Sequence, residues 1–198
     1  IVGRTKGAIL VPEEIYEKYG HIGNIVFPSG AIVRGKKLHI FYGATDTTCC
    51  TASVDLKNLI ETMRPETVGK DIIRFEKNPI ILPNSLNAWE AKATFNPAAI
   101  DLGGRIHLLY RAMSQSNTSV IGYASSLNGL NIDERLSDPI YVPRENFELA
   151  TIPGNSGCED PRIIQIGKIL YMCYTAFDGV HPPRVAITSI SQKDFLAK

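Results

Sequence analysis

One pattern occurs three times along this chain. In each copy a proline opens a run of β-favouring residues, a glycine followed by a basic residue interrupts it, and a second such run ends in tyrosine. A turn of this kind between two β-rich runs is typical of a β-hairpin. The copies begin at Pro28, Pro97 and Pro161 and end at Tyr42, Tyr110 and Tyr174.

Two further β-rich elements accompany each hairpin. Four strands per unit, repeated about every 65 residues, predict an all-β propeller whose units bury their faces against one another. A β-sandwich is the alternative because repeated hairpins also occur there, but a sandwich does not require this register. A third run after each hairpin is marked by residues 51–53, 123–125 and 185–187, and an apolar element ending in proline precedes each hairpin at residues 9–12, 80–83 and 140–143.

Charge and hydropathy narrow the class of protein. The chain has 198 residues, with 21 Lys and Arg against 20 Asp and Glu, so its formal net charge is +1. Such balance argues against broad attraction to nucleic acid or to an anionic membrane. The sequence has no stretch of about 18 apolar residues and no secretory signal pattern at its start, which predicts a cytoplasmic protein. The four cysteines form no Cys-x-x-Cys pair, and no metal cofactor is expected.

The organisation along the chain has three parts. Residues 1–62 carry one set of strands and a short helix, residues 63–71 form a linker, and residues 72–198 carry about two further blades. The helix is predicted over residues 55–63, where apolar residues follow helical spacing after the acidic N-cap Asp55. Arg64 and Pro65 should end it.

Several motifs resemble glycoside hydrolase family 130. The resemblance implies a five-bladed β-propeller that acts as a β-mannoside phosphorylase or a related β-mannosidase. About three consecutive blades are expected in this chain. The motifs are Phe95-Asn96-Pro97-Ala98-Ala99-Ile100, Leu108-Leu109-Tyr110-Arg111, Gly157-Cys158-Glu159-Asp160-Pro161-Arg162, Gly23-Asn24-Ile25-Val26-Phe27-Pro28 and Tyr42-Gly43-Ala44-Thr45-Asp46-Thr47.

The order of these motifs differs from that of the family. The segment resembling residues 1–62 comes last in the family, and the segment resembling residues 72–198 comes first. Because a propeller is a ring, its last blade lies beside its first. The chain is therefore interpreted as three consecutive blades that span the point where the ring closes, with the two middle blades missing. A junction of two tandem propellers or an incomplete circular permutant would give this order. The open blade faces then predict self-association.

The catalytic residue implied by the resemblance is Asp160, as the acid that protonates the leaving oxygen, in the phosphorylases through a sugar hydroxyl. Asp160 before Pro161 could instead only cap the start of a strand. Glu159 should point away from Asp160 on a regular strand, and therefore bind sugar or orient a partner. Arg162 completes the motif as a further substrate-binding residue.

Four other residues are expected at the substrate. Arg111 offers a hydrogen-bonding fork for sugar hydroxyls, or is a solvated rim residue. Asn96 is equivalent by register to Asp160, so the two should converge on the central cavity. The resemblance places Asp46 at the mannosyl unit, although an Asx-turn is nearly as good an interpretation. Trp89 either stacks on a sugar face or plugs the propeller edge.

The sequence therefore predicts inverting phosphorolysis of a β-mannoside or β-manno-oligosaccharide, giving α-mannose 1-phosphate with inorganic phosphate as co-substrate. A hydrolytic β-mannosidase is the alternative within the family, and a non-catalytic carbohydrate- or protein-binding propeller is the alternative outside it. The family's phosphate-binding basic residues are expected beyond Lys198, so phosphorolysis and hydrolysis both stay open.

Overall fold

The first blade is a four-stranded antiparallel sheet. The computed structural model describes residues 5, 7–63 and 72–198. Blade 1 has the strand order β1-β2-β3-β4, with each strand next to its neighbour in sequence. Its strands are β1 (Val26–Arg34), β2 (Lys37–Ala44), β3 (Thr48–Asp55) and β4 (Ile73–Arg74).

The remaining strands form two more blades. Blade 2 contains β5 to β8 and blade 3 contains β9 to β11, and a short parallel pairing of Thr118 and Ser119 with Ser156 and Gly157 joins them into one hydrogen-bonded sheet. The strands are β5 (Ala93–Leu102), β6 (Arg105–Met113), β7 (Thr118–Ser126), β8 (Glu134–Arg135), β9 (Ser156–Ile166), β10 (Ile169–Phe177) and β11 (Arg184–Ser191).

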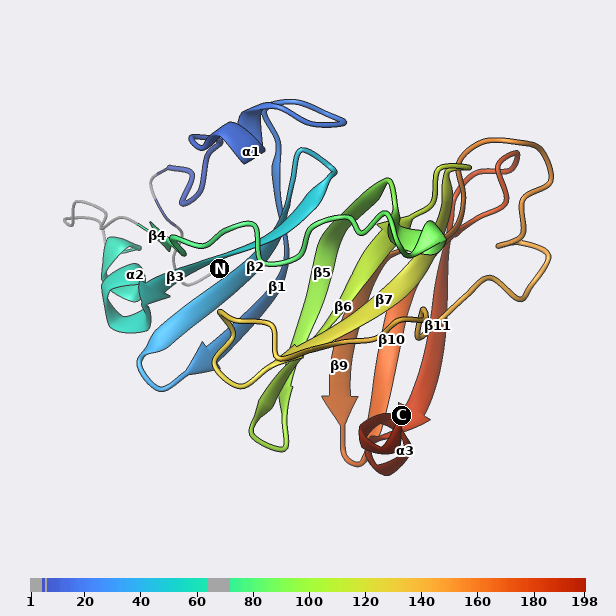
Figure 1. Ribbon diagram of the computed structural model, residues 1–198. Helices are drawn as coiled ribbons and strands as arrows, with labels where there is room; N and C mark the ends of the chain where they lie inside the picture. The colour runs from blue at the N-terminus through green and yellow to red at the C-terminus, as the bar shows by residue number, and fades with distance from the viewer. Residues whose placement is uncertain (1–4, 6, 64–71) are drawn as a thin grey trace.

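We use the word blade for each of the three sheet units, which pack against one another (Figure 1): β1 to β3 of blade 1 are blue and cyan, blade 2 is green and yellow, and blade 3 is orange and red. Their first strands, β1, β5 and β9, contact one another. The hairpins fall where the repeat predicts them, and their turns contain the glycines Gly35, Gly103 and Gly167, with φ of 59°, 58° and 62°. The prediction of an all-β fold is confirmed.

Two of the three elements that precede the hairpins, residues 80–83 and 140–143, pair with the preceding blade. Ile81 forms a bridge with Cys49 in β3, and Tyr141 forms one with Ile121 in β7. This differs from the sequence-based grouping, which placed them with the hairpin that follows. They extend the outer edge of the sheet already formed, next to the fourth strand.

The register of blade 3 also corrects one alignment. Ala186 lies opposite Tyr174, as Cys50 and Gly122 lie opposite Tyr42 and Tyr110. The structural counterpart of Ala52 and Ala124 is therefore Thr188, two residues further on. The sequence alignment missed this because the short motif around residues 185–187 resembles the other copies without sharing their pairing.

Short helices connect the strands. The helix predicted over residues 55–63 is present as α2 (Leu56–Thr62), and the Asp55 carboxylate accepts a hydrogen bond from the Asn58 amide at 3.0 Å, as expected of an N-cap. The expected helix end at Arg64-Pro65 and nearly all of the predicted linker lie outside the described residues. No helix within the described residues is long and apolar enough to cross a membrane. The other helices are α1 (Ile15–Lys18), the 3₁₀ turn η1 (Ala88–Glu90) and α3 (Gln192–Ala197).

The core lies between the blades. Successive side chains of a strand point to opposite faces, and the two faces of β6 pack against different blades. Leu108 and Tyr110 pack with Phe41 of blade 1, whereas Leu109 packs with Cys158 of blade 3. Blade 2 therefore buries both faces of β6 because a neighbouring blade stands on each side of it.

A buried polar cluster recurs once per blade. Glu17, Glu90 and Glu148 are fully buried, and each accepts a hydrogen bond from the tyrosine that ends its hairpin, namely Tyr42, Tyr110 and Tyr174. An arginine from the fourth strand joins the cluster in blades 1 and 2: Arg74 lies 2.9 Å from Glu17, and Arg135 lies 2.6 Å from Glu90. We call this the Glu–Tyr–Arg cluster. It joins the segment before the hairpin, the hairpin and the fourth strand of one blade.

Candidate active site

The backbone at the marker prolines departs from a regular strand. Asn96 and Asp160, each just before a marker proline, have φ of 50° and 49°, in the left-handed region that few non-glycine residues adopt. The pairing of β5 with β6 shifts register between Phe95 and Ala98, and that of β9 with β10 shifts opposite Cys173 to Thr175. A β-bulge of this kind changes the direction of a side chain without ending the strand.

Asn96 and Asp160 are in contact. The Asn96 amide nitrogen donates a hydrogen bond to Oδ1 of Asp160 at 2.9 Å, across the boundary between blades 2 and 3. Equivalent positions on neighbouring blades thus converge, as the register predicted. The Asp160 side chain is 29% exposed and can be reached by a ligand. The other amide atom of Asn96, Oδ1, is buried without a hydrogen-bond partner in the structure.

Arg111 lies beside both carboxylates of the motif. One terminal nitrogen of its guanidinium is 2.5 Å from Glu159 and the other is 3.4 Å from Asp160, while Nε donates to the hydroxyl of Ser119 at 3.0 Å. The guanidinium also stacks over the Phe95 ring, 4.8 Å from its centre. Arg111 therefore contacts two acidic side chains and a hydroxyl at the same time.

The expectation that Glu159 points away from Asp160 is wrong. Strict alternation would place adjacent side chains on opposite faces, but the left-handed backbone at Asp160 breaks that alternation, so both carboxylates reach the same guanidinium. Sequence spacing alone does not reveal a bulge, because neither residue is a glycine.

Burial and charge act together on the acidic groups. Burial raises the pKa of the Glu159 carboxyl, and the charge of Asp160 adds to this, while Arg111 opposes it. Burial likewise raises the pKa of Asp46, again opposed by Arg111 and reinforced by Asp160. Asp46 of blade 1 therefore lies close enough to Arg111 and Asp160 for their charges to affect its carboxyl group. No hydrogen bond to its side chain is found among the described residues, so the Asx-turn is not observed.

Blade 1 approaches the cluster closely through glycine. A Cβ atom added at Gly43 would lie 2.4 Å from Oδ1 of Asn96. A Cβ at Gly30 would lie 2.8 Å from the carbonyl oxygen of Pro97, which accepts a hydrogen bond from Ser29 at 2.8 Å. Two glycines in blade 1 therefore allow its backbone to pack directly against the residues that form the site.

Arg162 and Trp89 occupy different surroundings. Arg162 donates to the carbonyl oxygens of Asp160 and Pro161 at 3.2 and 2.9 Å, and its guanidinium lies over the Phe27 ring of blade 1 at 5.8 Å. Trp89 stacks on Tyr110 with ring centres 6.5 Å apart, on the face of β6 opposite to Arg111, and its N–H donates to the carbonyl of Ser137 at 2.9 Å. Its contacts are those of a residue that packs between blades 1 and 2.

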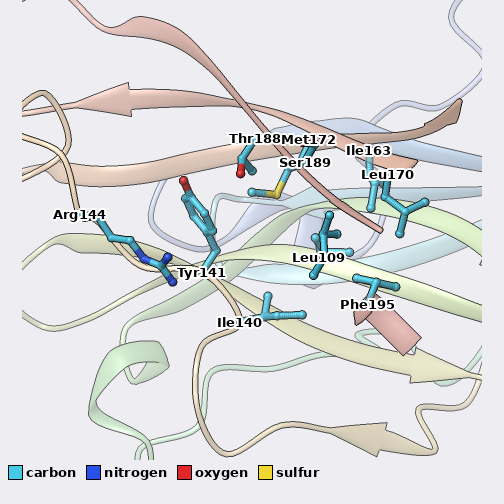
Figure 2. A pocket seen from close by; sticks show the side chains of 11 residues that line it. Leu109, Ile140, Tyr141, Arg144, Ile163, Leu170, Met172, Thr188, Ser189 and Phe195 are labelled. Atoms are coloured by element: carbon cyan, nitrogen blue, oxygen red, sulfur yellow. The ribbon is translucent and has the colours of Figure 1, made fainter. Parts of the chain in front are cut away.

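The structure also contains an apolar cavity of about 240 Å³ (Figure 2). Its walls come from blades 2 and 3, and none of the sequence-predicted site residues lines it. Within the described part of the chain, no three His, Cys, Asp or Glu side chains are grouped to hold a metal ion. The cavity is lined by Leu109, Ile140, Tyr141, Arg144, Ile163, Leu170, Met172, Thr188, Ser189, Ile190 and Phe195.

Ser119 and Phe95 belong to the site but were not predicted from the sequence. Ser119 lies between Arg111 and Glu159, with its hydroxyl 3.4 Å from the Glu159 carboxylate. It comes from β7, which carries no motif at that position, so no sequence signal pointed to it. Phe95 belongs to the motif Phe95-Asn96-Pro97, and its position next to Asn96 could have indicated that it lies at the site.

The fold and the acidic cluster define an all-β, propeller-like protein whose candidate site lies where neighbouring blades meet. The chain belongs to glycoside hydrolase family 130: the family model described as β-1,4-mannooligosaccharide phosphorylase matches residues 1–65 and 70–197.

Two similar proteins come from Thermoanaerobacter sp. (strain X514). A 1,2-β-oligomannan phosphorylase is 39% identical over 111 residues, which is 52% of this chain and 35% of the relative. A β-1,2-mannobiose phosphorylase is 38% identical over 124 residues, which is 54% of this chain and 38% of the relative. The matches thus span little more than a third of the length of these relatives.

Solved structures agree with these relationships. A glycosyl hydrolase from Bacteroides ovatus is similar with a TM-score of 0.53 and 33% identity, over 60% of this chain and 37% of that one. The same values apply to a structure from a study of GH130 glycoside hydrolases that target β-1,2-mannosidic linkages in Candida mannan. A GH32 β-fructofuranosidase from Bombyx mori shares the fold alone, with a TM-score of 0.59 and 14% identity over 84% of this chain and 34% of that one.

Proposed function

We propose that this chain is part of a β-mannoside phosphorylase that transfers a mannosyl group to inorganic phosphate. The observation that carries the proposal is the cluster at the blade 2–blade 3 boundary, where Asp160 is held by Asn96 and Arg111 and remains open to a ligand. Family membership and the phosphorylases among the relatives support the same reaction.

In the proposed reaction Asp160 is the source of the proton for the leaving oxygen. The glycosidic C–O bond breaks, a phosphate oxygen bonds to the anomeric carbon from the opposite face, and the leaving sugar keeps the proton, which gives α-mannose 1-phosphate with inversion. Arg111 and Asn96 fix the orientation of the acid. Glu159, kept beside Arg111, together with Asp46 and Arg162, completes the set of residues proposed to bind or border the substrate, whereas Trp89 packs on the opposite face of β6.

We also propose that the described blades are an arc of a five-bladed ring. The exposed apolar residues on the outer strand of blade 3 support this, since Val185 and Ile187 are 83% and 69% exposed. Apolar side chains at this position of a propeller pack against the next blade. Until such a face is covered, self-association is expected there.

The test is the release of mannose 1-phosphate from β-1,2- and β-1,4-mannobiose, with and without inorganic phosphate. It is run on the 198-residue chain and on the longest polypeptide that contains it. Phosphate-dependent turnover that Asp160→Asn abolishes, with an unchanged melting temperature, supports the proposal. The matched control is Asp138→Asn, an exposed aspartate outside the cluster, which should keep full activity.

Two results would contradict it. Release of free mannose at the same rate without phosphate would identify a hydrolase instead, and unchanged turnover in Asp160→Asn would remove Asp160 from the mechanism.

A further inference from the structure

The turn that carries Asp46 has an unusual backbone. It joins β2 to β3 through residues 45–47, and Thr45 and Asp46 both lie in the left-handed region, with φ of 53° and 51°. A β-branched residue such as threonine is rarely found there. Such a conformation costs free energy and persists only where the surrounding structure holds it. The contacts around this turn therefore determine where Asp46 lies.

A segment from the start of blade 1 runs along this turn. We call residues 20–25 the strap. The N–H of Ile22 in the strap donates a hydrogen bond to the Thr45 carbonyl at 3.0 Å, and the Thr45 N–H donates one to the carbonyl of Ile25, also at 3.0 Å. The strap therefore binds both main-chain polar groups of the residue just before Asp46.

Thr47 joins the strap to the turn through its side chain. Its hydroxyl accepts a hydrogen bond from the His21 N–H at 3.0 Å and donates one to the Thr45 carbonyl at 3.0 Å. A Cβ atom added at Gly20 would lie 2.8 Å from this hydroxyl oxygen, so the strap approaches too closely at that point for a side chain. One hydroxyl group thus links the strap to the peptide group that precedes Asp46.

The turn is also bound to blade 2. The Thr47 carbonyl accepts a hydrogen bond from the N–H of Thr94 at 2.9 Å. Thr94 belongs to β5 and stands two residues before Asn96, whose side chain donates to the carboxylate of Asp160. The turn is therefore fixed relative to the residues that hold the proposed acid.

The Asp46 carboxyl itself has no such support. No hydrogen bond to its oxygens is found in the part of the chain that the structure describes, so its position depends on the turn. Burial raises the pKa of this half-buried carboxyl; Arg111 of β6 opposes the effect, Asp160 of β9 adds to it, and His21 of the strap opposes it. A carboxyl released towards solvent would lose these influences together.

We propose that Thr47 is a positioning residue for Asp46: with the strap, it holds the strained turn so that the Asp46 carboxyl stays at the site beside Arg111. Without the hydroxyl, the strap loses its side-chain bond and the turn can relax. A small displacement of a binding group lowers catalysis even when the group itself is unchanged. The inference rests on the proposed function for the substrate that Asp46 meets, but not for the way in which Asp46 is held.

The first test follows the Asp46 carboxyl by ¹³C NMR during a pH titration of the 198-residue chain. In Thr47→Val, which keeps the shape of the side chain without its hydroxyl, we expect the pKa of Asp46 to fall towards its ordinary value of 3.8, because the released carboxyl is less buried. Thr47→Ser keeps the hydroxyl and should preserve the parent titration. The matched control is Thr51→Val, since the buried Thr51 hydroxyl has no hydrogen-bond partner within the described chain.

The second test measures phosphorolysis of β-1,2- and β-1,4-mannobiose by the longest polypeptide that contains the chain. We expect Thr47→Val to lower kcat/KM about tenfold or more, because Asp46 no longer meets the substrate in its productive position. Thr47→Ser should recover most of this loss, and Thr51→Val should leave kcat/KM unchanged.

Three outcomes would overturn the inference: an unchanged Asp46 titration in Thr47→Val, an equal shift in Thr51→Val, or an active enzyme whose kcat/KM does not respond to Thr47→Val. Absent turnover, or turnover that Asp160→Asn does not affect, would instead contradict the proposed function. The titration needs no turnover, so it decides how Asp46 is held in either case.

Hydrogen exchange in the unmodified chain covers the case in which Thr47→Val does not fold. The N–H groups of His21, Ile22 and Thr45 should be protected, because each donates to a group of the turn or the strap. Exchange of these groups as fast as that of an open loop would overturn the inference.

Discussion

Removing a single hydroxyl from one Glu–Tyr–Arg cluster should destabilise the protein measurably. In blade 2 the buried hydroxyl of Tyr110 donates to Glu90 at 2.8 Å and accepts from Nε of Arg135 at 3.2 Å. Tyr110→Phe keeps the ring and its stacking on Trp89 but removes both hydrogen bonds. Hydrogen bonds to charged groups contribute about 1.5–3 kcal/mol, so we expect a loss of about 2–3 kcal/mol in the free energy of unfolding.

For a domain of this size, that loss corresponds to a decrease of about 4–12 °C in melting temperature. The assay is thermal and urea unfolding followed by circular dichroism. The control is Tyr171→Phe, which removes a tyrosine hydroxyl from β10 for which the described residues provide no hydrogen-bond partner, and it should change stability by less than about 0.5 kcal/mol.

The reasoning would be refuted if Tyr110→Phe cost no more than Tyr171→Phe. A double-mutant cycle with Arg135→Gln adds a second check, because residues of one network should show a coupling of about 0.5 kcal/mol or more.

Two other predictions concern stability. Burial alone would raise the pKa of Glu17, but Arg74 and two backbone N–H groups outweigh burial and hold the pKa below its usual 4.5. The ionised Glu17 carboxylate therefore stabilises the folded protein above about pH 4.5, and this contribution is lost as the pH falls further. In urea titrations at a series of pH values, Glu17→Gln should reduce the loss of unfolding free energy at acid pH. Gly157 has φ of 112°, and an added Cβ would lie 2.1 Å from the Ser119 carbonyl oxygen, so Gly157→Ala should cost about 3 kcal/mol or more in urea unfolding. The same change at Gly7, which has open space around it, should have little effect, and equal losses at the two glycines would contradict the steric argument.

The repeat in the sequence predicted the hairpins and the meeting of Asn96 with Asp160, because both depend on equivalent positions in neighbouring blades. The helix after β3 was predicted separately, from the spacing of its apolar residues and the N-cap Asp55. The repeat did not predict that Glu159 and Asp160 share one guanidinium. That arrangement depends on a left-handed backbone at Asp160, a conformation that aspartate adopts without any distinctive neighbour in the sequence.

The Glu–Tyr–Arg clusters escaped the sequence analysis for a different reason. The tyrosines were visible as the ends of the hairpins, but their partners lie far away in sequence: Glu17 and Arg74 are 57 residues apart. Nothing in local periodicity identifies a glutamate in a one-turn helix or a loop as fully buried. The separations between glutamate and tyrosine, 25, 20 and 26 residues, also differ between the blades, so a fixed spacing does not reveal the pairs.

These clusters also bear on how such a chain can be divided. Each complete cluster ties together a stretch that starts before its hairpin and ends after its third strand, from Glu17 to Arg74 and from Glu90 to Arg135. New chain ends placed inside either stretch would separate groups that are buried together. Ends placed between the stretches, at residues 75–89, leave both clusters in one piece. Gene duplication or engineered permutation in this architecture should therefore favour breakpoints in those connecting segments over breakpoints at the hairpin turns.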